Sequence, residues 1–305
     1  MTAEYAISKD ESWPPLPLGE WKETCDTLHM WTQVVGKVRL ELSPHLNHWW
    51  EVPLYVTARG LTTSPIPCMR GIFEVQFDFI SHELAVITSW NEARRIHLYT
   101  RTVADFYREF FDILGALGIR ADIWPMPVEV PNPIRFDQDV LHSRYDPAYV
   151  HRFWRLLVTL DTIFKEFRAR FLGKSSPVHF FWGSFDLACT RFSGRRAPER
   201  QSADKITKEA YSHEEISAGW WPGGGAVADA AFYAYAAPEP SGFRQAVVRP
   251  AQAFYHAELG EFILAYQDVQ TAADPRAVLL EFLQTTYDAG ATLGNWDRAA
   301  LDKQS

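Results

Sequence analysis

Two stretches of the sequence place a histidine and an arginine around large aromatic side chains. "SPHLNHWWEVPLYVTARGL" contains His48 and Arg59, and "SSPVHFFWGSFDLACTRFSGR" contains His179 and Arg191. A histidine in a loop or at the start of a strand titrates near neutral pH and suits general acid–base catalysis. An arginine on an apolar strand face needs an anionic partner, either a carboxylate or a ligand. We therefore predict that the histidines act as acid or base and that the arginines hold a small anion.

Other candidate residues lie in or near the same stretches. In an alternating strand over 185–192, Arg191 shares the more apolar face, and Asp186 lies on the other, either as an exposed residue or as the group that orients a histidine. Paired tryptophans are better pocket candidates than isolated ones, most of which we expect to be core residues. The candidate catalytic residues are His48, His179 and Asp186, and the candidate substrate-binding residues are Arg59, Arg191, Trp49, Trp50, Trp220, Trp221 and His213.

Other chemistries have weaker support in the sequence. His45 and His48 share a loop, but there is no cysteine pair and no His-Glu-x-x-His motif, so no metal site is predicted and no cofactor is identified. "WGSFD" lacks the glycines of a nucleophile elbow. The glycine run at 222–225 is a flexible turn or a lid rather than a phosphate loop, because no Gly-Lys-Ser/Thr follows it. The alternative for each histidine and arginine is a structural role in its own half.

Hydrophobic periodicity predicts the elements that position these residues. Apolar residues three and four apart indicate helices, Thr102 with Asp105 resembles a capping box, and strict alternation such as that of Phe73, Val75 and Phe77 indicates a half-buried strand. Four prolines make 123–136 an extended connector. Helices are expected over 21–42, 102–117, 147–172 and 275–291, and strands over 50–58, 73–79, 83–89, 94–99, 178–182, 185–192 and 231–236.

Each half of the chain is thus predicted as helix, antiparallel strands, helix. Short links between strands favour antiparallel pairing, so we expect an α+β fold of two halves packed as one compact unit. Matching Ser-Pro, His and Arg positions suggest an internal duplication, and the alternative is one irregular α+β domain. The expected parts are an N-terminal half over 13–122, a connector over 123–146, and a C-terminal half over 147–296 with an insertion at 193–230.

The composition excludes several classes of protein. The chain has 305 residues and a net charge of −8, which argues against general nucleic-acid binding. No apolar run is long enough for a signal sequence or a membrane span, and three unpaired cysteines indicate a reduced, cytoplasmic protein. Residues 151–200 hold ten Lys/Arg against four Asp/Glu, which indicates either a solvated helix face or a pocket for a small anion.

Several longer segments carry a resemblance to a known family. "TLHMWTQVVGKVRLEL", "NHWWEVPLYVTARGLTTSPIP", "ADIWPMPVEVP" and "AYSHEEISAGWWPGGG" closely resemble a bacterial domain-of-unknown-function family, from about Trp13 to Trp296. The resemblance implies a bacterial cytosolic protein and carries no activity. The residues themselves favour an enzyme that uses His acid–base chemistry on a small anionic metabolite between the two halves. The alternatives are a non-catalytic ligand-binding or sensor protein and a structural or interaction protein without a site. The oligomeric state is not predicted.

Overall fold

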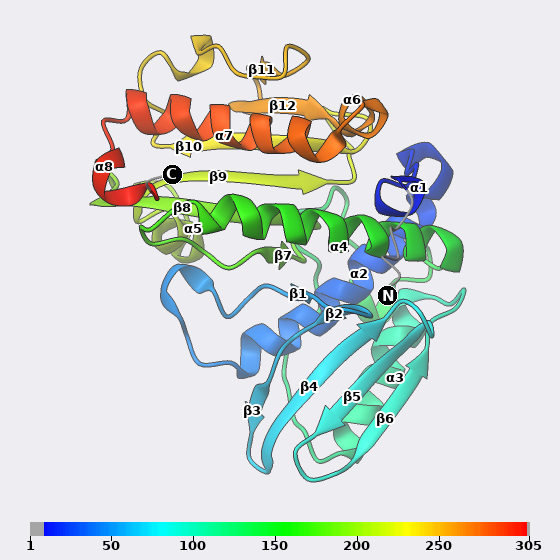
Figure 1. Ribbon diagram of the computed structural model, residues 1–305. Helices are drawn as coiled ribbons and strands as arrows, with labels where there is room; N and C mark the ends of the chain where they lie inside the picture. The colour runs from blue at the N-terminus through cyan, green and yellow to red at the C-terminus, as the bar shows by residue number, and fades with distance from the viewer. Residues whose placement is uncertain (1–8, 304–305) are drawn as a thin grey trace, which may run out of the picture. The chain divides into compact units, whose positions relative to one another are not determined.

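The structure is a computed structural model that describes residues 9–303 (Figure 1). The described chain forms two compact units: the first contains residues 9–41 and 55–161, and the second contains 42–54 and 162–303. Each unit holds one antiparallel sheet together with helices. The predicted α+β fold with two antiparallel sheets is therefore confirmed.

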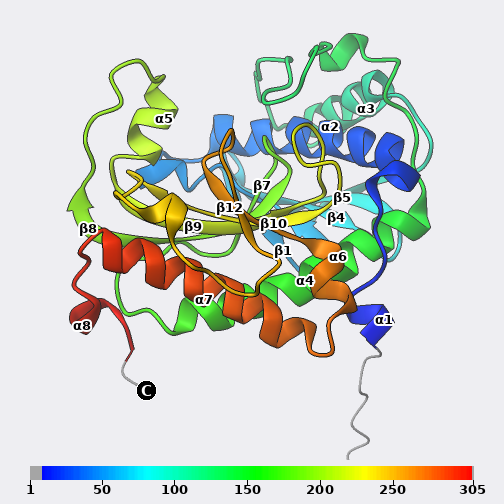
Figure 2. The same cartoon turned by 90° about the horizontal axis from the view of Figure 1, so that it is seen from above.

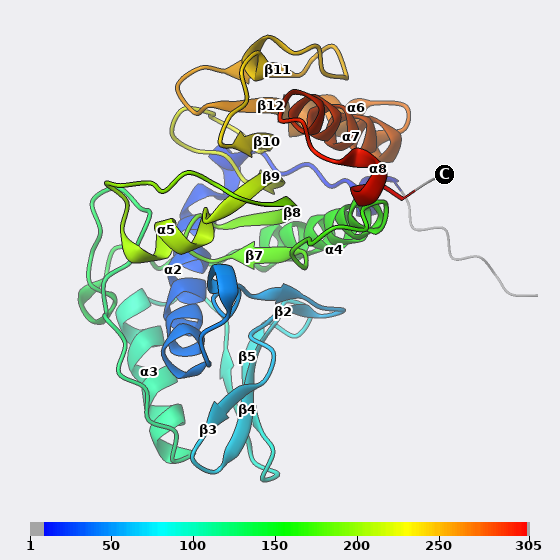
Figure 3. The same cartoon turned by 90° about the vertical axis from the view of Figure 1, so that its left-hand side faces the viewer.

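The first unit is built around a six-stranded sheet. Its strand order is β1-β2-β4-β5-β6, and β3 pairs with β4. Figures 1 and 3 show α2 and α3 on the same side of this sheet. The elements are α1 (Lys9–Ser12), α2 (Leu18–Leu42), β1 (Tyr55–Val56), β2 (Gly60–Thr62), β3 (Ile66–Cys68), β4 (Gly71–Asp78), β5 (Glu83–Thr88), β6 (Ala93–His97), α3 (Val103–Ala116), η2 (Phe136–Gln138) and the first part of α4 (Pro147–Ala169).

Local sequence explains most of these elements. Phe73, Val75 and Phe77 alternate along β4 and are all buried, as the period of two predicts. Thr102 caps α3 by accepting a hydrogen bond from the backbone N–H of Asp105. The proline-rich connector has no regular helix over 123–135, as expected.

The second unit is also built around a six-stranded sheet, in the order β7-β8-β9-β10-β12-β11. The final part of α4 lies in this unit, and its predicted Phe/Leu stripe is buried, with Phe164 0% exposed. The other elements are η1 (Asn47–Trp49), β7 (His179–Phe181), β8 (Asp186–Arg196), α5 (Lys205–Ala210), β9 (His213–Trp221), β10 (Ala231–Ala237), η3 (Phe243–Gln245), β11 (Phe254–His256), β12 (Glu261–Ala265), α6 (Tyr266–Thr271), α7 (Pro275–Leu293) and α8 (Arg298–Leu301).

The two faces of the second sheet differ in chemistry. Figure 2 shows α7 along one face and α5 on the other side of the sheet. The α7 face is apolar except for Arg191, and the close approach of Gly290 to Ile216 shows how tightly the helix packs there. We call the opposite face the polar face. Strand register places the following residues on it: His179, Asp186, Thr190, Phe192, Glu215, Ser217, Gly219, Trp221, Tyr233, Tyr235 and Glu261.

Three predictions about organisation need correction. The predicted insertion 193–230 contains β9, which pairs with both β8 and β10 and is therefore integral to the sheet. The predicted strand over 50–58 is reduced to Tyr55–Val56. The predicted boundaries near 122 and 147 do not match the two units, because 42–54 belongs to the second unit and 123–146 to the first.

The internal duplication is not confirmed. In the first sheet, β4, β5 and β6 lie side by side in the order of the sequence. In the second sheet, β10 pairs with β12, and β11 lies outside β12 at the edge. His48 and His179 were matched as equivalent positions of two halves, yet both belong to the second unit.

The three cysteines are free thiols, with Cys25 and Cys189 buried. Within residues 9–303, no helix combines the length and the apolar character that crossing a membrane requires.

Candidate functional site

A strained turn positions His48 in the second unit. His48 and Trp49 are consecutive residues with φ of 60° and 59°, in the left-handed region that costs a non-glycine residue about 1–3 kcal/mol. The Nδ1 of His48 lies 2.9 Å from the carbonyl oxygen of Ala210, at the end of α5. Because a carbonyl only accepts, Nδ1 carries the proton, and the lone pair of Nε2 points elsewhere.

The ammonium group of Lys174 faces the lone pair of His48 Nε2. Its Nζ donates to His48 Nε2 over 2.8 Å. The ammonium group also lies 5.3 Å from the ring centroid of Trp50 and 5.1 Å from that of Phe192. No carboxylate in the described part of the chain forms an ion pair with Lys174. Among the described residues, the ammonium group is contacted by two aromatic rings and a neutral imidazole.

Two further histidines join this group. The rings of His48 and His213 are 5.3 Å apart, and the imidazole of His48 stacks on Phe192 at 4.7 Å. Trp50 contacts His48 at 5.5 Å and His179 at 5.9 Å. We call His48, Trp50, Lys174, Phe192 and His213 the His48 cluster. The structure thus brings together three of the predicted histidines and one of the predicted tryptophans.

The His48 cluster favours neutral imidazoles. Burial lowers the pKa of His48, and the positive charge of Lys174 lowers it further, against the hydrogen bond to Ala210. The pKa of His213 is lowered by burial and then by the charges of Lys174 and Arg196. Burial also lowers the pKa of Lys174. At neutral pH both imidazoles are therefore expected to be uncharged and able to accept a proton.

A buried carboxyl group adjoins the His48 cluster. Glu215 lies directly opposite Phe192 across the β8–β9 pairing and is 6% exposed. Burial raises its pKa to about 8, although the charge of Arg200 and a hydrogen bond from Tyr235 act in the opposite direction. Glu215 is therefore largely protonated at pH 7, so it has a proton to donate.

A second acidic group lies further along the polar face. The carboxylate of Asp186 accepts hydrogen bonds from the hydroxyls of Ser184 and Tyr233. Burial nevertheless raises its pKa to about 6. The pKa of Glu261 is raised to about 7 by burial and then by the charge of Asp186. The phenol of Tyr233 passes directly over Gly219, where a Cβ would lie 2.4 Å from it.

The remaining predicted site residues are placed elsewhere in the second unit. Trp49 contacts His45 at 4.6 Å. Trp221 lies on the polar face beside Tyr233, with ring centroids 5.6 Å apart. Trp220 is fully buried on the α7 face. The tryptophan pairs therefore do not line one pocket wall together.

Arg191 is buried on the α7 face, away from the polar face. Its guanidinium lies 3.5 Å from the ring of Phe167 and 4.3 Å from that of Tyr287, and it donates to the carbonyl of Phe167. Burial lowers its pKa to about 10. Its partners are thus aromatic rings and a helix carbonyl, not the anion that the sequence suggested.

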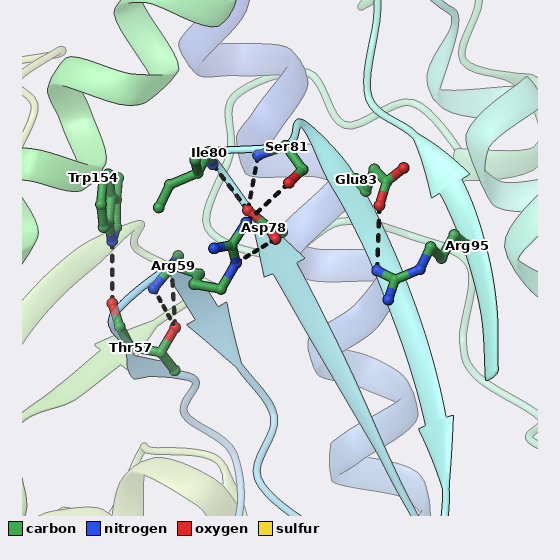
Figure 4. A network of polar contacts seen from close by, with 9 residues as sticks. Thr57, Arg59, Asp78, Ile80, Ser81, Glu83, Arg95 and Trp154 are labelled. Atoms are coloured by element: carbon green, nitrogen blue, oxygen red, sulfur yellow. Dashed lines mark hydrogen bonds and ion pairs between the residues drawn. The ribbon is translucent and has the colours of Figure 1, made fainter. Parts of the chain in front are cut away.

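Arg59 belongs to the first unit, where it pairs with Asp78 (Figure 4). The Nε–Oδ2 distance is 2.6 Å, and Nη2 donates to Ser81 over 2.9 Å. Burial favours the neutral form of Asp78, but Arg59 and the backbone N–H groups of Ser81 and Ile80 hold its pKa below the usual range. This ion pair fastens the turn after β4, which is a structural role.

Sequence reasoning missed Lys174, Glu215, Tyr233, Tyr235 and Glu261. A signal for Glu215 was present, because Glu215, Ser217, Gly219 and Trp221 alternate with Ile216, Ala218 and Trp220 as in a strand with one polar face. Lys174 has no such local pattern. Its role depends on contacts with His48, Trp50 and Phe192, which are distant in sequence.

A hollow of about 650 Å³ lies along α5, beside the His48 cluster. Its charged lining residues are Arg196, Lys205, Lys208, Glu199 and Glu209, and Lys208 pairs with Glu199 at 3.4 Å. Among residues 9–303 there is no group of three or more His, Cys, Asp or Glu side chains placed to hold a metal ion.

The fold and the polar face define an α+β protein with two antiparallel sheets and a histidine- and carboxyl-rich sheet surface. Comparison with protein families matches residues 13–303 to a family of unknown function, DUF5996, and the chain belongs to this family. No curated protein and no solved structure shows significant similarity to it.

Proposed function

We propose that this protein is an enzyme that carries out acid–base chemistry on a small anionic metabolite at the His48 cluster. One observation carries the proposal. His48, a histidine with a lowered pKa, stacks on Phe192, and Glu215, a carboxyl with a pKa of about 8, lies opposite Phe192 across the β8–β9 pairing. Surroundings that push the pKa values of two groups in opposite directions assign a base and an acid. At pH 7 the imidazole accepts a proton and the carboxyl donates one.

The local charge supports an anionic substrate. Arg196, Lys205 and Lys208 outnumber the carboxylates Glu199 and Glu209 in the lining of the hollow, and Lys174 adds a positive charge at the His48 cluster, although the whole chain carries −8. Such a field concentrates small anions. The proposal includes a bacterial cytoplasmic protein without a nucleic-acid partner, since the overall negative charge repels a phosphate backbone.

The test is a panel of small carboxylates and phosphate esters, read as the shift in melting temperature. A ligand at 100 times its Kd adds about 2.7 kcal/mol to the free energy of unfolding. We expect at least one compound to stabilise the wild type and to lose this effect in Lys174→Met. The matched control is Lys22→Met, which removes a lysine paired with Asp26 in the first unit.

Mass spectrometry of each stabilising compound then separates catalysis from binding. Conversion of a compound by the wild type that is lost in His48→Gln supports an enzymatic function. Recovery of every stabilising compound unchanged would instead support a ligand-binding protein. If no compound in the panel stabilises either the wild type or Lys174→Met, the anion site is contradicted.

A further inference from the structure

Lys174 is fixed at its backbone, and its side chain is exposed to solvent. Its backbone carbonyl accepts a hydrogen bond from the N–H of Phe192 over 3.0 Å, which fixes it beside β8 just after α4 ends. The side chain is exposed to solvent while its ammonium group lies against Trp50 and Phe192. Part of the side chain is therefore open to solvent next to the ammonium group.

The surroundings of Lys174 differ from those of the ion-paired lysines Lys22 and Lys208. Lys22 and Lys208 pair with Asp26 and Glu199, which stabilise the charged ammonium form. Around Lys174, the described residues provide two aromatic rings and an imidazole, with no carboxylate in ion-pair contact. The ring faces and the imidazole lone pair attract the ammonium, but burial outweighs them and lowers the pKa of Lys174, so the nucleophilic neutral amine forms more readily than at an ion-paired lysine.

A proton acceptor is already in place. His48 Nε2 lies 2.8 Å from Nζ, and the hydrogen bond from Nδ1 to Ala210 holds the ring in the tautomer that accepts. A nucleophile, a base within hydrogen-bond reach and a third group that orients the base are the parts of an activated nucleophile.

We propose that Lys174 forms an imine with a small aldehyde or ketone that carries a carboxylate or phosphate group. The anionic part of this inference rests on the proposed function, whereas the amine chemistry rests on the contacts of Lys174 alone. Arg196, paired in register with His213, is a candidate partner for the anionic group.

The step balances without an oxidant or reductant. His48 Nε2 takes one proton from the Lys174 ammonium, and the amine nitrogen forms a bond to the carbonyl carbon. The carbonyl oxygen takes a first proton from that nitrogen to give a carbinolamine. The C–O bond then breaks, and the oxygen leaves as water with a second proton from the nitrogen. The product is a C=N bond, which can regain the proton held by His48.

Reductive trapping tests this inference on the full chain. The protein is incubated with glyoxylate and cyanoborohydride near neutral pH, and the reduced carboxymethyl adduct is located by peptide mass spectrometry. We expect labelling of Lys174 to exceed that of Lys205 and Lys208 by about tenfold or more. Labelling of Lys174 at or below the level of those two would overturn the inference.

Two variants identify the parts of the reaction. Lys174→Arg keeps the positive charge and must abolish the adduct at this position. His48→Gln must lower labelling of Lys174 to the level of Lys205, while labelling of Lys205 itself reports that the protein is intact. Unchanged labelling of Lys174 in His48→Gln would refute the role of His48 as base.

The outcome is separable from that of the proposed function. If small anions stabilise the protein but Lys174 is not trapped, the imine is wrong and the anion site remains. If Lys174 is trapped and no anion stabilises the protein, the amine chemistry stands and the anionic substrate is wrong.

Discussion

Replacing Glu215 by glutamine should make the protein less sensitive to pH. Glu215 is 6% exposed, and burial raises its pKa from 4.5 to about 8. Below pH 4.5 the carboxyl is protonated in both the folded and the unfolded chain. As the pH rises from 4.5 to about 8, only the unfolded chain loses the proton, so the free energy of unfolding falls. Glutamine has no proton to lose.

The size of the effect follows from the same values. Each pKa unit between the folded and unfolded states is worth about 1.4 kcal/mol, which gives about 5 kcal/mol for Glu215 as a maximum if water stays out of the site. Near pH 4 the variant and the wild type should therefore unfold with similar free energies. Above pH 8 the variant should be more stable by up to that amount, since its amide oxygen can still accept from Tyr235.

Urea unfolding followed by tryptophan fluorescence at both pH values measures this difference. Glu214→Gln is the matched control, because Glu214 is the neighbouring residue and pairs with Arg195 at the surface, at 2.6 Å. Its effect should stay within about 1 kcal/mol at either pH. A Glu215→Gln difference that does not change with pH would refute the claim that the folded protein keeps this carboxyl protonated.

Three other substitutions test the packing and the charges of the second unit. Lys174→Met should raise the pKa of His48, measured by NMR titration, because it removes a positive charge and a hydrogen bond to the neutral ring. Gly219→Ala should lower the free energy of unfolding by about 1–3 kcal/mol in urea titrations, because its Cβ would overlap the phenol of Tyr233. Phe164→Ala should cost about 3–5 kcal/mol in the same assay, because the ring is fully buried.

Each of these has a control in the same chain. Lys205→Met should leave the pKa of His48 unchanged. Gly115→Ala, at a helix position with no atom within 4 Å, should stabilise the protein by about 0.5–1 kcal/mol. Leu172→Ala, at a side chain 65% exposed, should have almost no effect. A loss below about 1 kcal/mol for Phe164→Ala would show that this helix face is not packed as described.

Elements with a clear local period were predictable from the sequence. The alternation in β4, the capping box of α3 and the Phe/Leu stripe of α4 each depend on residues within one element. β9 was missed because the residues before it are polar, which made the whole stretch resemble an insertion. Its Glu215 and Ser217 do not face solvent but lie buried on the polar face.

The candidate site was predictable only in part. Histidines and aromatic residues near the strand starts indicated His48, His179, His213 and Trp50, which do come together. The sequence also placed Arg191 on the apolar face, but not its partners, because Phe167 and Tyr287 come from two distant helices. Lys174 was not predictable, since a lysine after a helix is ordinarily a solvated surface residue.

The pKa values of His48 and Glu215, measured by NMR in one sample of the full chain, test the central claim most directly. In isolated form a glutamate titrates near 4.5 and a histidine near 6.5. The structure inverts this order, so we predict that His48 titrates below 6.5 and Glu215 near 8. A glutamate that titrates near 4.5, with His48 at or above 6.5, would contradict the assignment of an acid and a base at this site.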